Sequence, residues 1–107
     1  MRIGWVTDIH LSVCSDEGRE KFYDQILAAR LSALWVGGDI GEADNIVHWL
    51  RELCAAVDIP VYCVLGNHDY YFGSIRQVRE NVALLCQELP NLHYLSQRNV
   101  VAVTDNI

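Results

Sequence analysis

The sequence lacks any run of basic residues. Eight Lys and Arg stand against 14 Asp and Glu, which gives a formal net charge of −6. Non-specific binding to nucleic acid or to an anionic membrane depends on clustered positive charge, so we expect neither partner. An acidic protein that acts on phosphate groups needs positive charge from another source, and a bound metal ion is the usual one.

The sequence also lacks a Cys-x-x-Cys pair and a long apolar run. The four cysteines are spread along the chain, at Cys14, Cys54, Cys63 and Cys86. Their spacing favours reduced thiols, and we expect a cytoplasmic location. No apolar run approaches the roughly 20 residues of a membrane span, and the start of the chain reaches Asp8 too early for the apolar core of a signal peptide.

The composition is that of a folded chain of limited size. A hydrophobic fraction of 51%, a charged fraction of 21%, five Tyr and three Trp exclude a disordered protein. Because single domains usually contain about 100 to 150 residues, the 107 residues form one domain or part of one.

Short apolar runs alternate with segments of helical periodicity. Strands are predicted over residues 2–7, 33–37 and 61–65, and helices over 17–31, 45–57 and 74–89. Two further short strands are predicted at 93–95 and 99–103. The alternation predicts an α/β fold, with a parallel-rich sheet and helices on one of its faces.

The helix ends and the apolar stripes give more detailed predictions. The expected N-terminal caps of the three helices are Ser15 or Asp16, Asp44, and Ser74. In the first helix, the stripe predicted to face the sheet consists of Phe22, Ile26, Leu27 and Leu31. We assign Trp35 and Trp49 to the core.

Polar residues follow three predicted strands at the point where each strand ends. Asp8 and His10 follow the first strand, Asp39 the second and Asn67 the third. The carboxyl ends of parallel strands meet at one edge of a sheet, so these side chains are expected to converge. Carboxylate, imidazole and amide oxygen together favour divalent Mn, Fe, Co or Zn.

These motifs resemble those of the calcineurin-like metallophosphoesterase superfamily. The motifs are Asp-x-His, Gly-Asp and Gly-Asn-His-Asp, in this order and at strand ends, and together they are highly specific. The resemblance covers about residues 1–103. It implies half of a four-layer α/β/β/α sandwich. It also implies that Asp8 and His10 hold a first metal ion, that Asp39 bridges to a second, and that Asn67 ligates the second.

The resemblance also implies an activity. The protein would be a metal-dependent phosphoesterase that hydrolyses a phosphate ester by metal-activated water at a dinuclear site. His68 would contact the phosphate and stabilise charge or protonate the leaving oxygen, and Asp69 would orient its imidazole. The substrate stays open among monoesters, diesters, nucleotides and phosphoproteins.

The chain departs from the family pattern in two places. Glu42 stands where many members have a second acid, and no histidine follows His93, although members have a later His and a Gly-His-x-His motif. We therefore expect residues 1–107 to be a partial domain without its C-terminal half. In the family a second sheet packs on the open sheet face, so a second copy could cover that face here and form a homodimer. The alternative function is a non-catalytic half-domain or binding module with a weakened metal site.

Some residues keep two interpretations at this point. For Tyr70 and Tyr71, the sequence favours two interpretations equally: they line a substrate pocket, or they pack against the rest of the chain. Cys14 is close to His10 in sequence, but an ordinary loop thiol is the favoured interpretation. His48 and His93 are expected to be structural, because neither follows the carboxyl end of a strand.

Overall fold

Four short apolar runs form one parallel sheet. In the computed structural model, which describes residues 1–95, these strands are β1 (Ile3–Val6), β2 (Ala33–Val36), β3 (Val61–Cys63) and β4 (Leu92–Tyr94). They pair in the order β1-β2-β3-β4, and every pair is parallel. The predicted α/β fold is confirmed, and the strand predicted at 99–103 lies outside the described residues.

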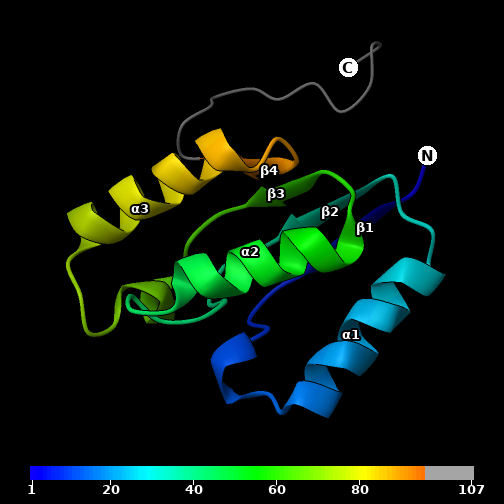
Figure 1. The fold of residues 1–107 in the computed structure, drawn as a ribbon, viewed down its shortest axis with the longest axis horizontal. Coiled ribbons are helices and arrows are strands. Elements are labelled where there is room, and N and C mark those ends of the chain that lie inside the picture. The colour runs from blue at the N-terminus through cyan, green and yellow to red at the C-terminus, as the bar shows by residue number, and fades with distance from the viewer. Residues whose placement is uncertain (96–107) are drawn as a thin grey trace.

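Three helices connect the strands and cover one face of the sheet (Figure 1). They are α1 (Asp16–Ala28), α2 (Ile46–Val57) and α3 (Ile75–Glu88), and two 3₁₀ turns, η1 (Leu11–Val13) and η2 (Asn67–Tyr70), follow β1 and β3. Strands added in sequence order with parallel pairing place successive crossover helices on the same side. No helix among residues 1–95 is long and apolar enough to cross a membrane.

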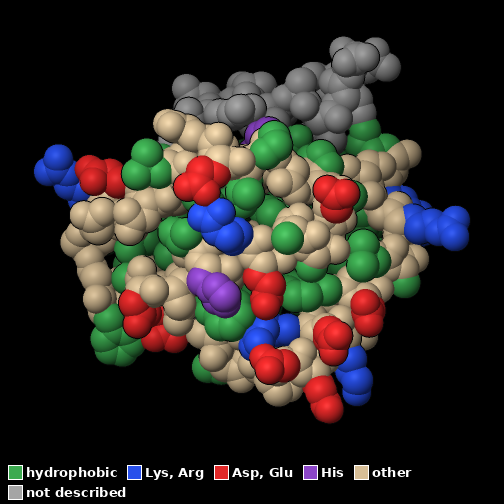
Figure 2. Space-filling view, viewed as in Figure 1, with side chains coloured by type: hydrophobic (Ala, Val, Ile, Leu, Met, Phe, Trp, Pro, Cys, Tyr) green, Lys and Arg blue, Asp and Glu red, His purple; other side chains and the backbone are tan. Residues whose placement is uncertain are grey.

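The core lies between the helices and the covered face of the sheet. Alternate strand residues point toward it, and Leu34, Val36, Val61 and Cys63 are buried there. The second and third helices contribute Ile46, Leu50, Leu53, Val78, Val82 and Leu85. Figure 2 views the molecule from the helix side and shows charged side chains scattered over the outer surface of the helices.

Two predicted helix caps are confirmed and one is wrong. The Ser15 hydroxyl accepts a hydrogen bond from the backbone N–H of Gly18, and the Ser74 hydroxyl accepts one from Gln77, both at 3.0 Å. At the start of α2 the N-cap is Asn45 instead of Asp44. The Asn45 side chain accepts from the Glu42 N–H at 2.7 Å, so it stabilises the preceding turn.

The first helix is shorter than predicted. It ends at Ala28, and Arg30 has a left-handed backbone with φ of 52°, so Leu31 lies beyond the helix. Leu27, predicted to face the sheet, is 50% exposed, whereas Tyr23 is buried. Ile26 is buried, and Phe22 and Leu31 pack against the core as predicted, so only Leu27 is wrong and Tyr23 takes its place.

The second face of the sheet is exposed around Trp5 and Trp35, whereas Ala33 and Tyr62 on the same face are buried. Its residues include Ile3, Trp5 and Trp35, and Trp5 pairs in register with Trp35 across the first two strands. Trp5 is 73% exposed and Trp35 is 42% exposed. The assignment of Trp35 to the core is therefore wrong, because its neighbours Leu34 and Val36 take the helix side and strand alternation turns Trp35 away. Trp49 does pack against the core.

Candidate metal centre

The segment after β1 runs directly beside the segment after β2. Three backbone hydrogen bonds of 2.8 to 3.0 Å join them: Asp8 N–H to Gly38 O, His10 N–H to Asp39 O, and Leu11 N–H to Ile40 O. These bonds continue the β1–β2 pairing past the ends of the strands. As a result Asp8 and His10 lie against Asp39, although about 30 residues of sequence separate them.

The turn after β3 contacts the Asp39 side chain. The backbone N–H of His68 donates to Asp39 Oδ1 at 2.9 Å. A Cβ added to Gly66 would collide with the Asp39 carboxylate, so Gly66 is in direct contact with it. Asn67 lies between these two residues and is exposed at the start of η2. The neighbours of Asn67 on both sides thus contact the same carboxylate.

Gly38 allows the close approach of the two turns. Its φ is +105°, and an added Cβ would lie 2.8 Å from the backbone nitrogen of Gly66. A residue with a side chain would be strained in this conformation and would also push the β3 turn away from Asp39.

The side chains of Asp8, His10 and Asp39 form a compact cluster of donors. Their ligand atoms all lie within 4.8 Å of one another. The His68 ring is also close, with its centroid 5.0 Å from that of His10 at an interplanar angle of 84°. Two carboxylates and an imidazole are a donor set that borderline divalent ions take in proteins. The residues therefore fit a metal ion.

All three clustered residues have a left-handed backbone, which the sequence did not indicate. The φ angles are 54° at Asp8, 43° at His10 and 52° at Asp39. For residues other than glycine this conformation costs about 1–2 kcal/mol each. Such strain persists only where the surrounding structure imposes it, and here the hydrogen bonds between the two segments do so. These hydrogen bonds therefore hold the backbone that carries the three donors in place.

The protonation of Asp39 is set by its neighbours. Burial alone would raise the pKa of Asp39, but the backbone N–H of His68, a hydrogen bond with the Asp8 side chain and the nearby imidazoles together lower it. The carboxylate form is thus favoured, which is the form that a metal ion requires.

Asp69 joins the two turns that surround Asp39. It is fully buried, at 0% exposure. Its carboxylate accepts three backbone hydrogen bonds: from Ile40 and Gly41 at 2.8 Å and from Gly66 at 2.9 Å. Burial raises the pKa of Asp69, and the hydrogen bonds oppose that rise. These contacts give Asp69 the role of holding the turns together. Its predicted role in orienting the His68 imidazole stays a prediction.

A second polar contact links the segment after β1 to the segment after β2. The Ser12 hydroxyl donates to the Glu42 carboxylate at 3.1 Å. Glu42, which replaces the second acid of the family pattern, therefore binds a neighbouring side chain.

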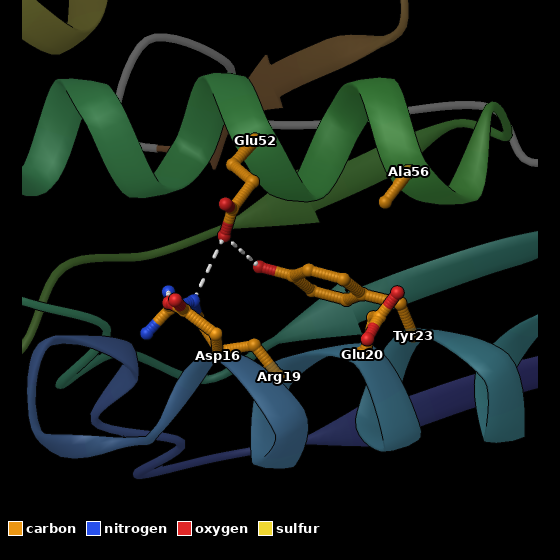
Figure 3. A pocket seen from close by; sticks show the side chains of 6 residues that line it. All are labelled: Asp16, Arg19, Glu20, Tyr23, Glu52 and Ala56. Atoms are coloured by element: carbon orange, nitrogen blue, oxygen red, sulfur yellow. Dashed lines mark hydrogen bonds and ion pairs between the residues drawn. The ribbon is translucent and has the colours of Figure 1, made fainter.

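Arg19 contacts the segment that follows His10. Figure 3 shows its side chain facing Glu52 of α2. Its guanidinium donates to the Cys14 carbonyl oxygen at 2.6 Å, pairs with Asp16, and lies 3.3 Å from Glu52 on α2. It also stacks over the Trp49 ring, 4.5 Å from the centroid. The planar guanidinium group can bind several partners in a fixed arrangement. Arg19 therefore joins the segment before α1, through Cys14, to Glu52 and Trp49 on α2.

The hollow beside Arg19 is separate from the donor cluster. It measures about 410 Å³ and is lined by Asp16, Arg19, Glu20, Tyr23, Glu52 and Ala56. The Tyr23 hydroxyl donates to Glu52 at 2.7 Å, and burial, together with this bond, raises the pKa of Tyr23. The one cation of the lining already pairs with two carboxylates, so the hollow has no spare positive charge for a phosphate.

The remaining candidates lie outside the cluster. The Cys14 thiol donates to the His10 carbonyl oxygen at 3.5 Å, so it contacts the backbone of that segment. His48 is exposed and packs edge-on against Trp49, and His93 stacks on Tyr62. Cys14, Cys54 and Cys63 are free thiols.

Comparisons with known proteins agree with this geometry. The chain is 28% identical over 96 aligned residues to a UDP-2,3-diacylglucosamine hydrolase from Chromobacterium violaceum, an alignment that covers 79% of this chain and 40% of the relative. The chain thus spans about two fifths of the length of that relative. No solved structure matches. The sequence profile of the calcineurin-like phosphoesterases matches residues 1–105, and the chain belongs to that family.

Proposed function

We propose that the protein acts as a metal-dependent phosphoesterase with a dinuclear site. The observation that carries this proposal is the convergence of Asp8, His10 and Asp39, with ligand atoms within 4.8 Å of one another. Membership of the calcineurin-like phosphoesterases supports a hydrolase of phosphate esters. The site opens at the carboxyl edge of the sheet, where α/β proteins bind their ligands.

We propose ligands for the two ions from the family resemblance, and the cluster of Asp8, His10 and Asp39 supports them. Asp8 and His10 would hold one ion, Asp39 would bridge, and Asn67 would ligate the second; Mn, Fe, Zn and Co suit these donors. Such ions neutralise the charge of the phosphate and activate water for attack on phosphorus. Asp39 is suited to bridging because the segments after β1 and β3 both contact it.

His68 would act on the phosphate. Its backbone N–H is bound to Asp39, and its ring lies beside that of His10, which places the imidazole at the edge of the donor cluster. From there it can donate a hydrogen bond to a phosphate oxygen or protonate the leaving oxygen. Asp69 would support this step indirectly, by holding the two turns around Asp39.

The substrate is proposed only as a class. The relative from Chromobacterium violaceum is named for the hydrolysis of UDP-2,3-diacylglucosamine. Because this chain covers 40% of that protein, we propose only a phosphate ester here. The free thiols suit a reducing compartment, and we propose a cytoplasmic location.

Manganese binding tests the site directly. Titration calorimetry of the native chain with Mn²⁺ should detect binding, and Asp39→Asn should weaken it by more than about 100-fold, because a shared ligand is lost. Asp24→Asn makes the same chemical change on the exposed surface of α1 and should leave binding unchanged. Equal Mn²⁺ affinity in both variants would contradict the proposal.

Turnover separates the proposal from its alternative. Hydrolysis of bis(p-nitrophenyl) phosphate in the presence of Mn²⁺, abolished by Asp39→Asn, supports the phosphoesterase. A folded chain that binds Mn²⁺ but produces no p-nitrophenol supports the non-catalytic half-domain. The absence of both binding and turnover contradicts the metal site itself.

A further inference from the structure

Two exposed aromatic side chains extend from His68, whose ring borders the donor cluster. Tyr71 and Phe72 follow η2 and are 49% and 85% exposed. The Tyr71 ring lies 4.5 Å from the His68 ring, and the Phe72 ring lies 6.4 Å from that of Tyr71, centroid to centroid. Together they extend the surface outward from the histidine that faces the phosphate.

Tyr70 and Tyr71, which the sequence left equivalent, have different surroundings. Tyr70 is partly buried and packs against the hydrophobic core. Tyr71 leaves half of its surface in solvent and contacts His68. Of the two, only Tyr71 is placed to meet a molecule bound at the site.

The backbone around Phe72 is fixed. The Tyr71 N–H donates to the His68 carbonyl, the Ala43 N–H donates to the Tyr71 carbonyl at 3.0 Å, and the Gly73 N–H donates to the Tyr70 carbonyl. A Cβ added to Gly73 would lie 2.5 Å from the Ala43 Cβ, so this segment is packed closely against the loop that precedes α2. The outward position of Phe72 is therefore part of the fold.

The conformation of Phe72 is unfavourable for folding. Its φ is 69°, a left-handed value that bulky side chains rarely adopt, and its ring is almost completely in water. Neither feature stabilises the chain, because burying the ring would have been favourable and a glycine would have been unstrained. Strained and exposed residues beside a site point to a role in binding.

We propose that Tyr71 and Phe72 form an aromatic ledge that binds the organic part of the substrate, and that this part is a planar aromatic or heteroaromatic group. The inference rests on the proposed function, since it assumes that the phosphate lies at His68 and the donor cluster. Aromatic faces hold flat rings by stacking and do so independently of charge. Binding by stacking suits this acidic protein, because the segment 70–74 that carries the ledge has no basic residue to attract a charged group.

The far side of Phe72 supports a ring that carries polar groups. Phe72 lines a hollow of about 200 Å³, together with Ala43, Asp44, Gly73, Ser74, Gln77, Val78 and Asn81. Hydroxyl and amide side chains of this kind can bind ring nitrogens and oxygens. Ser74 accepts from the Gln77 N–H and the Gln77 side chain donates to Asn81, so a ring would use the remaining hydrogen-bonding positions of these groups.

Two phosphonates test the ledge by binding, without turnover. Methylphosphonate and phenylphosphonate share the phosphorus group and differ in the ring. Titration calorimetry of each into the Mn²⁺-loaded native chain should show phenylphosphonate binding about three- to tenfold more tightly. Phe72→Ala should bring the ratio of the two affinities close to one, and Phe72→Tyr should preserve it. Methylphosphonate affinity should not change in either variant.

The controls separate the two proposals. Leu84→Ala removes another exposed apolar side chain, on α3, and should keep the native ratio. If methylphosphonate does not bind, the proposed function fails and the ledge fails with it. If methylphosphonate binds but Phe72→Ala leaves the ratio unchanged, the ledge alone is overturned. Circular dichroism of Phe72→Ala should match the native chain, because an 85% exposed ring contributes little packing.

Discussion

The two faces of the sheet differ sharply, although the same strands form both. On the covered face, Val36 and Cys63 are buried beneath the helices, and the residues of α2 that meet them are fully enclosed. On the open face, Trp5 and Trp35 form a registered pair with large exposed surfaces. The difference teaches that the main core lies on the helix side, while the part of the other face around Trp5 and Trp35 is apolar surface available for a partner.

The largest effect is expected on the covered face. Leu53 on α2 is fully enclosed in the core, so Leu53→Ala should lower the free energy of unfolding by about 2–5 kcal/mol, through lost burial and a residual cavity. Urea denaturation followed by circular dichroism measures this change. Leu84→Ala, at an exposed position of α3, should stay within about 0.5 kcal/mol of the native chain. Equal losses in the two variants would mean that the core is elsewhere.

Alkaline pH should also lower the free energy of unfolding, through two thiols buried on the covered face. Burial raises the pKa of Cys54 to about 12 and raises the pKa of Cys63 as well. In the unfolded chain both thiols ionise above about pH 8.5, whereas in the folded chain they stay protonated. Stability is therefore complete below that pH and falls above it, by roughly 1.4 kcal/mol per pH unit for each thiol. Urea midpoints between pH 8 and 10 measure the slope, which Cys54→Ala should reduce.

The smallest effect on stability is expected on the open face. Trp5→Thr replaces one strand-favouring residue of β1 with another and removes an exposed ring, so the free energy of unfolding should change by less than about 1 kcal/mol. A loss above 2 kcal/mol would show that Trp5 is covered in solution. The homodimer through this face stays a prediction. Light scattering over a range of concentrations tests it, and Trp5→Thr should weaken any self-association of the native chain.

The strain at the site could not be predicted from composition or periodicity. Asp8 and Asp39 have the residue types expected of ligands, but their left-handed backbone results from hydrogen bonds between segments about 30 residues apart. The assignment of Trp35 to the core was wrong because it, too, depends on contacts between distant segments. An apolar run shows that a strand is buried, but it does not show which of its residues the helices cover.

The sequence by itself determined the order of strands and helices, the serine caps of α1 and α3, and the position of each motif at the end of a strand. These features depend on local propensity and on spacing along the chain. Only the tertiary structure decided that Asp69 holds two turns together, that Tyr71 lies beside His68, and that Trp5 and Trp35 stay exposed. Contacts between distant segments decide such features, because burial and hydrogen-bond partners exist only once those segments have met.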